Sequence, residues 1–279
     1  MKASFFSIVL TSYNSDKFIK KTLESLLDQK YQKFEVILVD DGSNDNTLKI
    51  SNIYKNLNNF KLKIIKLKHS GSPARSRNVG VMKSKGEYIC FLDADDLFLK
   101  NKLFQLNKFI QKKKFDVFYH NVILKHKKKN LSCKKININN SLKDLLLNGN
   151  KIVLSSSCVN RSFLVKKKIK FNENKKLISV EDYDFWLQIA KLKGSFLLIN
   201  KTLGIYNLND LSISKRRFNH FLNTMYLLNQ YEKHLTKNKI SYFIRKLRII
   251  LSFIKICISE NDFHFFIALL KYKFSSIKI

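Results

Sequence analysis

Acidic residues, proline, cysteine and glycine are all scarce in this chain of 279 residues. It carries 21 Asp and Glu against 53 Lys and Arg, which gives a formal net charge of +32. Such an excess of positive charge favours a polyanionic partner, namely nucleic acid, an anionic membrane surface or a phosphorylated substrate. Alternatively, many of the lysines lie on solvated faces, so the charge alone does not choose a function.

The four cysteines are scattered and form no CxxC pair. Neither a disulfide framework nor a zinc site is therefore indicated, and a reducing cytoplasm is expected. No uninterrupted apolar stretch approaches the roughly 18–20 residues that span a bilayer. The apolar run after Lys2 ends at Thr11 without a small-residue cleavage site, so we do not expect a signal peptide.

Strand and helix patterns alternate through the first hundred residues. Short apolar runs at 5–11, 34–40, 62–67 and 87–93 predict buried strands. Strand–helix–strand order of this kind predicts right-handed βαβ units. We therefore expect an α/β fold with a mixed, mostly parallel sheet flanked by helices.

The alternation becomes looser after residue 100. We expect a helix at 101–111, a strand at 116–124, an exposed loop at 125–135 and a helix at 179–194 with an acidic first turn. From about residue 215 the chain reads as helical, is basic and contains no glycine. This last part predicts a basic helical C-terminal extension.

Three of the scarce acids, Asp93, Asp95 and Asp96, directly follow the fourth predicted strand. Ligands of parallel sheets bind beyond the carboxyl ends of the strands. Two carboxylates at such an end are suited to Mg²⁺ or Mn²⁺, which also bridges a diphosphate. The alternative is a turn of solvated acids, since Asp is common in turns, and the D-x-D pattern alone leaves both open.

Polar residues also follow the other predicted strands. Asp40 and Asp41 can accept hydrogen bonds from a base or ribose, or can serve only an Asx turn before the next helix. Arg75 and Arg77 begin a helix whose dipole opposes them unless an anion compensates. The alternative for these two arginines is an ordinary surface helix.

The segment "EDYDFW" places three acids and a tryptophan in the first turns of another helix. A carboxylate there can act as a general base toward a hydroxyl nucleophile, and an adjacent aromatic ring can stack on a sugar. The alternative, which the residues alone favour, is acids that the helix dipole stabilises and a tryptophan in the core.

Taken in order, the segments 5–48, 72–96 and 181–186 resemble the family 2 glycosyltransferases, which have the GT-A (Rossmann-like) fold. The resemblance implies an inverting transferase that uses a nucleotide-diphosphate sugar, most often a UDP-sugar, with Mn²⁺ or Mg²⁺. It also implies roles for individual residues. Thr11, Tyr13 and Asp41 would hold the base with Asp40 beside them, and Arg75 would lie near the base or diphosphate. Asp93 would face the ribose, and Asp95 would bind the metal. Asp182 would be the catalytic base, and Glu181 and Trp186 would lie on the acceptor side.

The chain departs from the family pattern after the last predicted strand. Asn207 and Asn209 stand where many relatives carry an Arg and a His, which puts a histidine contribution to metal or phosphate binding in doubt. The basic run 215–217 is a candidate replacement, and His220 lies nearby, although a lone histidine is more often structural.

We expect two regions, 1–214 and 215–279. The first is the GT-A domain, with a nucleotide-sugar-binding half (1–100) and an acceptor and catalytic-base half (101–214). In the second, residues 242–259 have apolar side chains at helical spacing among basic ones. This predicts a helix on an anionic inner membrane surface, or alternatively a helix packed on the catalytic domain.

The expected activity is transfer of a hexose or N-acetylhexosamine from a UDP-sugar to a hydroxyl of a growing, lipid-linked bacterial surface glycan, such as O-antigen, capsule or lipooligosaccharide. The enzyme would be cytoplasmic and peripheral on the inner face of the membrane. A nucleotidyltransferase would need a Gly-rich basic loop after the first strand. The segment there, "TSYNSD", contains neither glycine nor a basic residue. A nucleic-acid-binding protein would need a basic face with exposed aromatics or a reader motif, and we expect no nucleic-acid partner.

Overall fold

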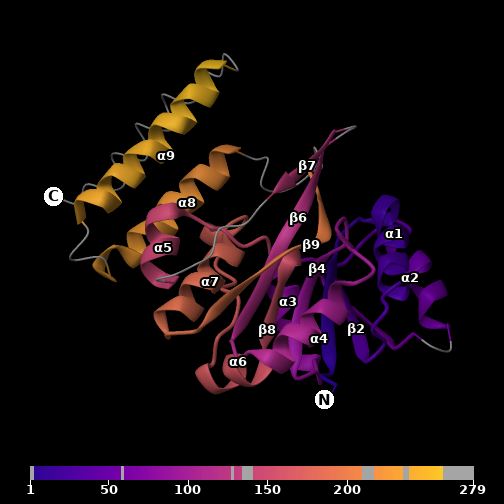
Figure 1. Ribbon diagram of the computed structural model, residues 1–279. Coiled ribbons are helices and arrows are strands. Elements are labelled where there is room, and N and C mark those ends of the chain that lie inside the picture. The colour runs from indigo at the N-terminus through magenta and orange to yellow at the C-terminus, as the bar shows by residue number, and fades with distance from the viewer. Residues whose placement is uncertain are drawn as a thin grey trace.

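The computed structural model describes residues 3–57, 60–126, 129–133, 141–208, 217–234 and 239–259, and Figure 1 shows a central sheet with helices on both sides. The strands are β1 (Phe6–Ser12), β2 (Phe34–Asp40), β3 (Leu62–Lys66), β4 (Tyr88–Asp93), β5 (Leu97–Phe98), β6 (Val117–His126), β7 (Lys129–Cys133), β8 (Ser157–Asn160) and β9 (Phe196–Asn207). The helices are α1 (Asp16–Leu27), α2 (Thr47–Lys55), α3 (Pro73–Lys83), α4 (Lys102–Lys112), α5 (Ser141–Asn148), α6 (Arg161–Lys167), α7 (Glu181–Lys191), α8 (Arg217–Tyr231) and α9 (Lys239–Ser259). Two short 3₁₀ turns, η1 (Leu154–Ser156) and η2 (Lys175–Leu177), precede β8 and α7.

The strands form one mixed sheet in the order β3-β2-β1-β4-β8-β6-β9-β5, with β7 paired to β6. β3, β2, β1 and β4 are mutually parallel, β8 is antiparallel to both its neighbours, and β6 and β9 are parallel. This confirms the predicted α/β class and the mixed sheet. The parallel half places the carboxyl ends of four adjacent strands at one edge, as βαβ connections require.

Two hydrophobic clusters pack on opposite faces of the sheet. Phe6, Ile8 and Leu10 of β1 point to the face covered by α1 and α4, whereas Val9 belongs to the cluster that includes α3, α5 and α7. The alternation follows from the two-residue period of a strand. Since both faces are covered, β1 is buried along its whole length and reads as a continuous apolar run in the sequence.

One predicted loop is a strand. Residues 129–133 pair with the end of β6 as β7, from Val122 opposite Cys133 to His126 opposite Lys129. The prediction of an exposed loop over 125–135 is therefore wrong for this part. The five residues of β7, KNLSC, include no β-branched or aromatic side chain and lie among lysines, so they give no clear strand signal.

The C-terminal helices pack on α7 and on each other. Buried side chains of α8 and Tyr242 of α9 belong to the same cluster as those of α7, and Tyr231 Oη donates to Asp184 Oδ1 over 2.9 Å. The predicted boundary between 214 and 215 lies outside the described residues and stays a prediction. None of the helices in the described ranges is long and apolar enough to cross a bilayer.

Candidate active site

The residues that follow β1, β2 and β4 meet at one edge of the sheet. In the strand register Thr11 lies opposite Asp93 and Ser12 opposite Asp40. Thr11 Oγ1 donates to Asp93 Oδ1 over 3.0 Å. The parallel half of the sheet thus brings these predicted site residues together.

Asp40 organises the turn that follows β2. It is fully buried, and its Oδ1 accepts from the backbone N–H groups of Gly42 and Ser43 at 3.1 and 2.8 Å. Its Oδ2 accepts from the hydroxyls of Ser12 and Ser43. These contacts match the Asx-turn alternative, in which Asp40 fixes the shape of the turn.

Asp41 joins this turn to the loop that follows β3. Its carboxylate accepts from the backbone and hydroxyl of Ser70 and from the backbone of Gly71. His69 Nδ1 lies 3.0 Å from Asp41 Oδ2, and the His69 ring stacks on Tyr13 with centroids 4.1 Å apart. Tyr13 is 44% exposed, so a flat aromatic surface remains available beside Asp41.

Arg77 lies at the centre of the acidic residues. Ser72 caps α3 by accepting from Ala74 N, and Pro73 occupies the first turn. One turn later the buried Arg77 guanidinium donates to Glu181 over 2.7 Å and to Asp93 over 3.0 Å. Burial opposes the charge of Arg77, but these two carboxylates outweigh it and raise its pKa above the ordinary value.

The three acids after β4 have different surroundings. Asp93 contacts Arg77 and Asp95 is partly exposed. Asp96 is fully buried, and burial followed by the charges of Asp95 and Asp93 raises its pKa well above the usual value. Its Oδ1 accepts from Asn207 N over 2.9 Å. Asp96 therefore helps to shape the turn.

A buried lysine lies behind this turn. Lys102, at the start of α4, is fully buried, and its Nζ donates to Ser155 O over 2.6 Å and lies 3.3 Å from the Phe98 ring centroid. Burial lowers its pKa to about 8. Ser155 Oγ accepts from Asp93 N over 3.2 Å, so Lys102 supports the residue that fixes the backbone of the turn.

The acidic first turn of α7 sends its three carboxylates in different directions. Glu181 pairs with Arg77, Asp182 accepts from Asn150 Nδ2 over 3.0 Å, and Asp184 contacts Tyr231 on α8. Asp184 therefore bonds to α8 and takes no part in the hydrogen bonds of Arg77 to Glu181 and Asp93.

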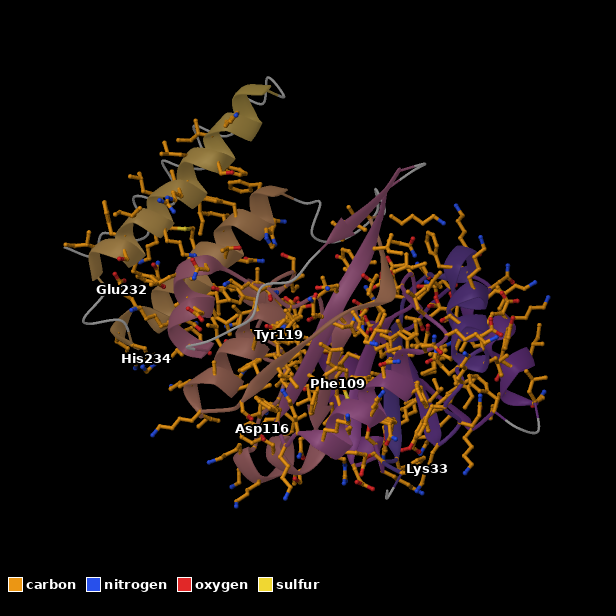
Figure 2. All side chains as sticks on the ribbon, in the orientation of Figure 1. Lys33, Phe109, Asp116, Tyr119, Glu232 and His234 are labelled. Carbon is orange, nitrogen blue, oxygen red and sulfur yellow. The ribbon has the colours of Figure 1, made fainter. Side chains whose placement is uncertain are left out.

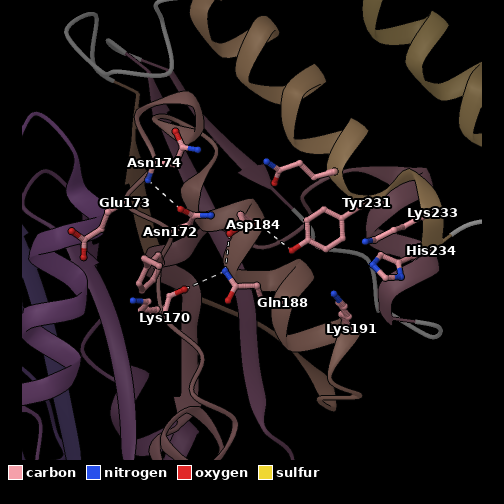
Figure 3. Close-up of a pocket in the computed structure, with 12 residues that line it drawn as sticks. Lys170, Asn172, Glu173, Asn174, Asp184, Gln188, Lys191, Tyr231, Lys233 and His234 are labelled. Carbon is pink, nitrogen blue, oxygen red and sulfur yellow. Dashed lines mark hydrogen bonds between the residues drawn. The ribbon is translucent and has the colours of Figure 1, made fainter. Parts of the chain in front are cut away.

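Asp184 lines a separate pocket of about 660 Å³ (Figure 3). The pocket lies between α7, the segment 170–174 and the end of α8, and Asp184 also accepts from Gln188 Nε2 over 2.7 Å. Burial raises the pKa of Asp184. The hydrogen bond from Tyr231 to Asp184 joins α8 to α7, and Glu181 is paired with Arg77. Asp182 is therefore the carboxylate of this turn that is available to act as a base.

Asp182 has the pKa of a usable base. Removal from water raises its pKa to about 7, the negative charge of Glu181 acts in the same direction, and Arg77 opposes both. The hydrogen bonds from Tyr183 N and Asn150 also favour the ionised form. Near neutral pH such a carboxylate can take a proton from a hydroxyl group.

Tyr206, near the end of β9, lies between the two groups of acids. Burial raises the pKa of its phenol above the ordinary value, and the charges of Asp96, Asp93, Asp182 and Asp95 all add to the shift. The phenol of Tyr206 therefore interacts electrostatically with acids of the turn after β4 and with Asp182 at the start of α7. The site consequently includes β9 in addition to the parallel strands.

Several residues of this site were not assigned from the sequence. His69 opens a polar segment after the third predicted strand and Tyr206 directly precedes Asn207, but neither residue received a role, and Asn150 was not singled out. Of the two arginines, the family resemblance gave a role to Arg75 and none to Arg77. The structure buries Arg77 among the acids and leaves Arg75 exposed.

The structure does not place Trp186 toward the site. Its side chain is fully buried in the cluster with Phe185, as the core alternative expected. Glu181 is likewise directed inward, to Arg77. An acceptor would therefore meet Asp182 rather than either of these two in the structure described.

The segment proposed to replace the family's Arg and His is only partly described. Asn207 donates through Nδ2 to Asp95 O, so it binds the backbone of the acidic turn. Asn209 and residues 215–216 lie outside the described residues. His220 contacts Ser179 Oγ over 3.1 Å, a contact within the fold.

The donor set fits a dication that is shared with a ligand. Among the described residues no three His, Cys, Asp or Glu side chains gather to hold a metal ion. Mg²⁺ and Mn²⁺, however, are commonly held by one or two carboxylates together with substrate phosphates. Asp95 and Asp93, partly exposed at the end of β4, match that arrangement.

Comparison with known proteins places this geometry in a family. The chain is 29% identical over 253 residues to an uncharacterized glycosyltransferase of Haemophilus influenzae, covering 88% of this chain and 95% of that protein. It is 27% identical over 250 residues to the amylovoran biosynthesis glycosyltransferase AmsB of Erwinia amylovora, with coverage of 86% and 82%.

Solved structures show the same fold. TarS 1–349 of Staphylococcus aureus in complex with UDP-GlcNAc superimposes with a TM-score of 0.63 and 27% identity over 75% of this chain and 60% of that one. A mannosyltransferase of Pyrobaculum calidifontis with GDP-Man and Mn²⁺ gives a TM-score of 0.65 at 14% identity over 93% and 76%, a likeness of fold alone. The family model for glycosyl transferase family 2 matches residues 7–170, more than half of the chain, and the protein therefore belongs to that family.

Proposed function

We propose that the protein transfers a hexose or N-acetylhexosamine from a UDP-sugar, with inversion, to a hydroxyl of a growing lipid-linked surface glycan. One arrangement supports this most directly, namely the carboxylate of Asp182 beside the Arg77–Asp93–Glu181 cluster at the strand ends. A UDP-GlcNAc complex of a structural neighbour supports the donor. The names of AmsB and of the Bacillus subtilis minor teichoic acid biosynthesis protein GgaA support a surface glycan.

The donor would lie along the edge formed by β1, β2 and β4. Tyr13, stacked on His69, offers a face for the base, and Asp41 lies next to it. Asp93, held by Thr11 and Arg77, would meet the ribose. Asp95 would hold Mn²⁺ or Mg²⁺, which supplies neutralisation of the departing diphosphate when it is bound.

The transfer is a single displacement at the anomeric carbon. Asp182 accepts the proton of the acceptor hydroxyl while that oxygen forms the new bond to the sugar. The bond from the anomeric carbon to the diphosphate oxygen breaks, and UDP leaves with the electron pair. Asn150 orients the Asp182 carboxylate, and Arg77 stabilises its ionised form.

The proposed location is the cytoplasmic face of the membrane, with the protein bound peripherally. A lipid-linked acceptor would be presented at that surface. The positive charge of the chain favours contact with anionic lipid headgroups. The helix face that would make this contact is derived in the next subsection.

The test is UDP release with a panel of UDP-sugars, Mn²⁺ and synthetic lipid-diphosphate acceptors, together with UDP binding by calorimetry. Asp182→Asn is expected to abolish transfer and to retain UDP affinity, and Asp95→Ala to lose the metal-dependent part of that affinity. Asp184→Asn, in the same helix turn but directed to α8, is the matched control and should transfer normally. Normal transfer by Asp182→Asn would remove that residue from the role of base.

A further inference from the structure

Helix α9 has one face packed on the protein and one face that no described element covers. On the packed side Tyr242, Arg245 and Phe253 are 1%, 9% and 7% exposed. Tyr242 Oη donates to Leu228 O on α8, and Phe253 stacks on Phe221 with centroids 4.4 Å apart. The helix is therefore held in a fixed orientation about its own axis.

The outward face carries a stripe of large apolar side chains. Its members are Ile240, Phe243, Ile244, Leu247 and Leu251, with exposed fractions of 78%, 66%, 41%, 42% and 54%. Their spacing of three and four residues places them in one arc of about 100° along the helix. We refer to these five residues as the α9 stripe.

The α9 stripe differs from the other exposed apolar residues of the described chain. Ile53, Met82 and Phe104 lie on three separate helices, α2, α3 and α4, and scattered residues of this kind are normal on protein surfaces. Five apolar side chains in a row on one helix are not. A continuous strip of this kind indicates a surface that is covered when the protein works.

The positive charges of α9 border the stripe. Arg248 and Lys255 are exposed and lie on the neighbouring arc, together with Ser241 and Ser252. The helix from Lys239 to Ser259 contains no Asp or Glu. The partner of this face must therefore accept apolar side chains and also offer negative charge.

We propose that the outward face of α9 lies on an anionic membrane surface, with the α9 stripe inserted at the boundary between headgroups and acyl chains. Arg248 and Lys255 would then meet the lipid phosphates, as in amphipathic helices that lie in the interface plane. A second copy of this chain fits less well, because a two-fold contact would bring the same acid-free basic face against itself.

The inward face links this membrane contact to the active site. Arg245 Nη1 donates to Leu145 O over 2.9 Å, and the same carbonyl accepts from Tyr183 Oη over 2.6 Å. Tyr183 follows Asp182 directly on α7. Docking of α9 would therefore set the orientation of Asp182 relative to the bilayer, a consequence that rests on the proposed function, whereas the membrane contact itself does not.

The contact is tested with purified protein and lipid vesicles, without any sugar nucleotide. Binding to vesicles of phosphatidylcholine with about a third phosphatidylglycerol is compared with binding to pure phosphatidylcholine by cosedimentation. The variant Phe243→Ser/Leu247→Ser/Leu251→Ser removes the centre of the α9 stripe. Its matched control is Ile53→Ser/Met82→Ser/Phe104→Ser, which removes three exposed apolar side chains elsewhere.

The wild-type protein and the control are expected to bind the anionic vesicles, and the stripe variant to bind at least about tenfold more weakly with an unchanged melting temperature. Arg248→Glu/Lys255→Glu should also weaken binding, more than Lys112→Glu/Lys166→Glu on other helices. Equal binding by the stripe variant and the control would overturn the proposal. A wild-type dimer that the stripe substitutions dissociate, without vesicle binding, would assign the face to a second copy instead.

Discussion

At the scale of single residues, the site depends on how charges are paired in a region of low water content. Arg77 forms ion pairs with Glu181 and Asp93, Asp96 is buried with a raised pKa, and Asp182 has a pKa of about 7. A chain with few acids can concentrate them here because Arg77 pairs with two of them and the pKa of Asp96 is raised. The pairing decides which carboxylate is reactive.

The pKa of Asp182 predicts the pH dependence of transfer. Because burial and Glu181 raise it to about 7, the base is protonated below that pH, and the rate should fall as pH decreases through about 7 rather than through about 4. Asn150→Ala removes a hydrogen bond that favours the ionised form and should move this limb to higher pH. The measurement is the pH profile of kcat/KM, which reports the free enzyme, for both proteins, with Asp184→Asn as a control whose limb should not move.

Replacement of Arg77 predicts a large loss of stability. Arg77→Met leaves two carboxylates at a buried position without their cation, which typically costs about 3–5 kcal/mol of unfolding free energy. Urea unfolding followed by the fluorescence of Trp186, the single tryptophan, measures this loss. Arg77→Met/Glu181→Gln should recover part of it, and a double variant no more stable than the single one would contradict the pairing.

At the scale of elements, the ends of the parallel strands and the first turns of α3 and α7 carry the site residues. Other elements, β9 among them, hold the acidic turn in position. β9 brings Asn207 to the turn after β4, and η1 brings Ser155 against Asp93 N. Lys102 at the start of α4 holds Ser155 from behind. The acidic turn is thus fixed by contacts from elements far apart in the sequence.

Lys102 predicts a pH-dependent contribution to stability. Burial lowers its pKa in the folded protein to about 8, below the value of about 10.4 expected for an unfolded chain. Between these values the unfolded chain binds more protons, so this group makes stability rise with pH from about 8 to about 10. The difference in unfolding free energy between wild type and Lys102→Met should therefore change over this range and be constant below it. An exposed control, Lys112→Met, should show no such change.

At the scale of the whole molecule, the C-terminal helices share the core of the catalytic region. Leu227, Leu228 and Tyr242 lie in the same cluster as Trp186 and Leu187 of α7. Glu232 (labelled in Figure 2) also pairs with Lys246 of α9 over 3.0 Å. The part of the extension that the structure describes therefore packs on the catalytic region through one face of α9 and leaves the other face uncovered.

This packing predicts joint unfolding. Arg245→Ala removes a buried charged hydrogen bond to Leu145 O and should lower the unfolding free energy by about 1.5–3 kcal/mol. Far-UV circular dichroism, which includes α8 and α9, and Trp186 fluorescence should report one shared transition in both proteins. Loss of helical signal before the change at Trp186 would instead make α9 an independent unit.

Much of the fold and the positions of the site residues could be predicted from sequence because they depend on local patterns. The apolar runs of β1, β2 and β4 reflect burial on both faces, and the polar residues that follow them lie at strand ends. β7 could not be predicted, because its five residues include no β-branched or aromatic side chain and lie among lysines. The central place of Arg77 could not be predicted either, since Arg75 and Arg77 both lie in the first turns of the same helix and only burial separates them.

The sequence by itself determined the α/β class, the family resemblance and the edge of the sheet where the acids gather. These features follow from the apolar runs, their order along the chain and the polar residues next to them, which are all local in the sequence. Only the tertiary structure decided which acids pair with Arg77, which one is buried beside Asn207 and which one remains near Asn150. Only it separated the packed face of α9 from the uncovered one. These outcomes depend on contacts between residues up to about a hundred positions apart, whose partners no local pattern specifies.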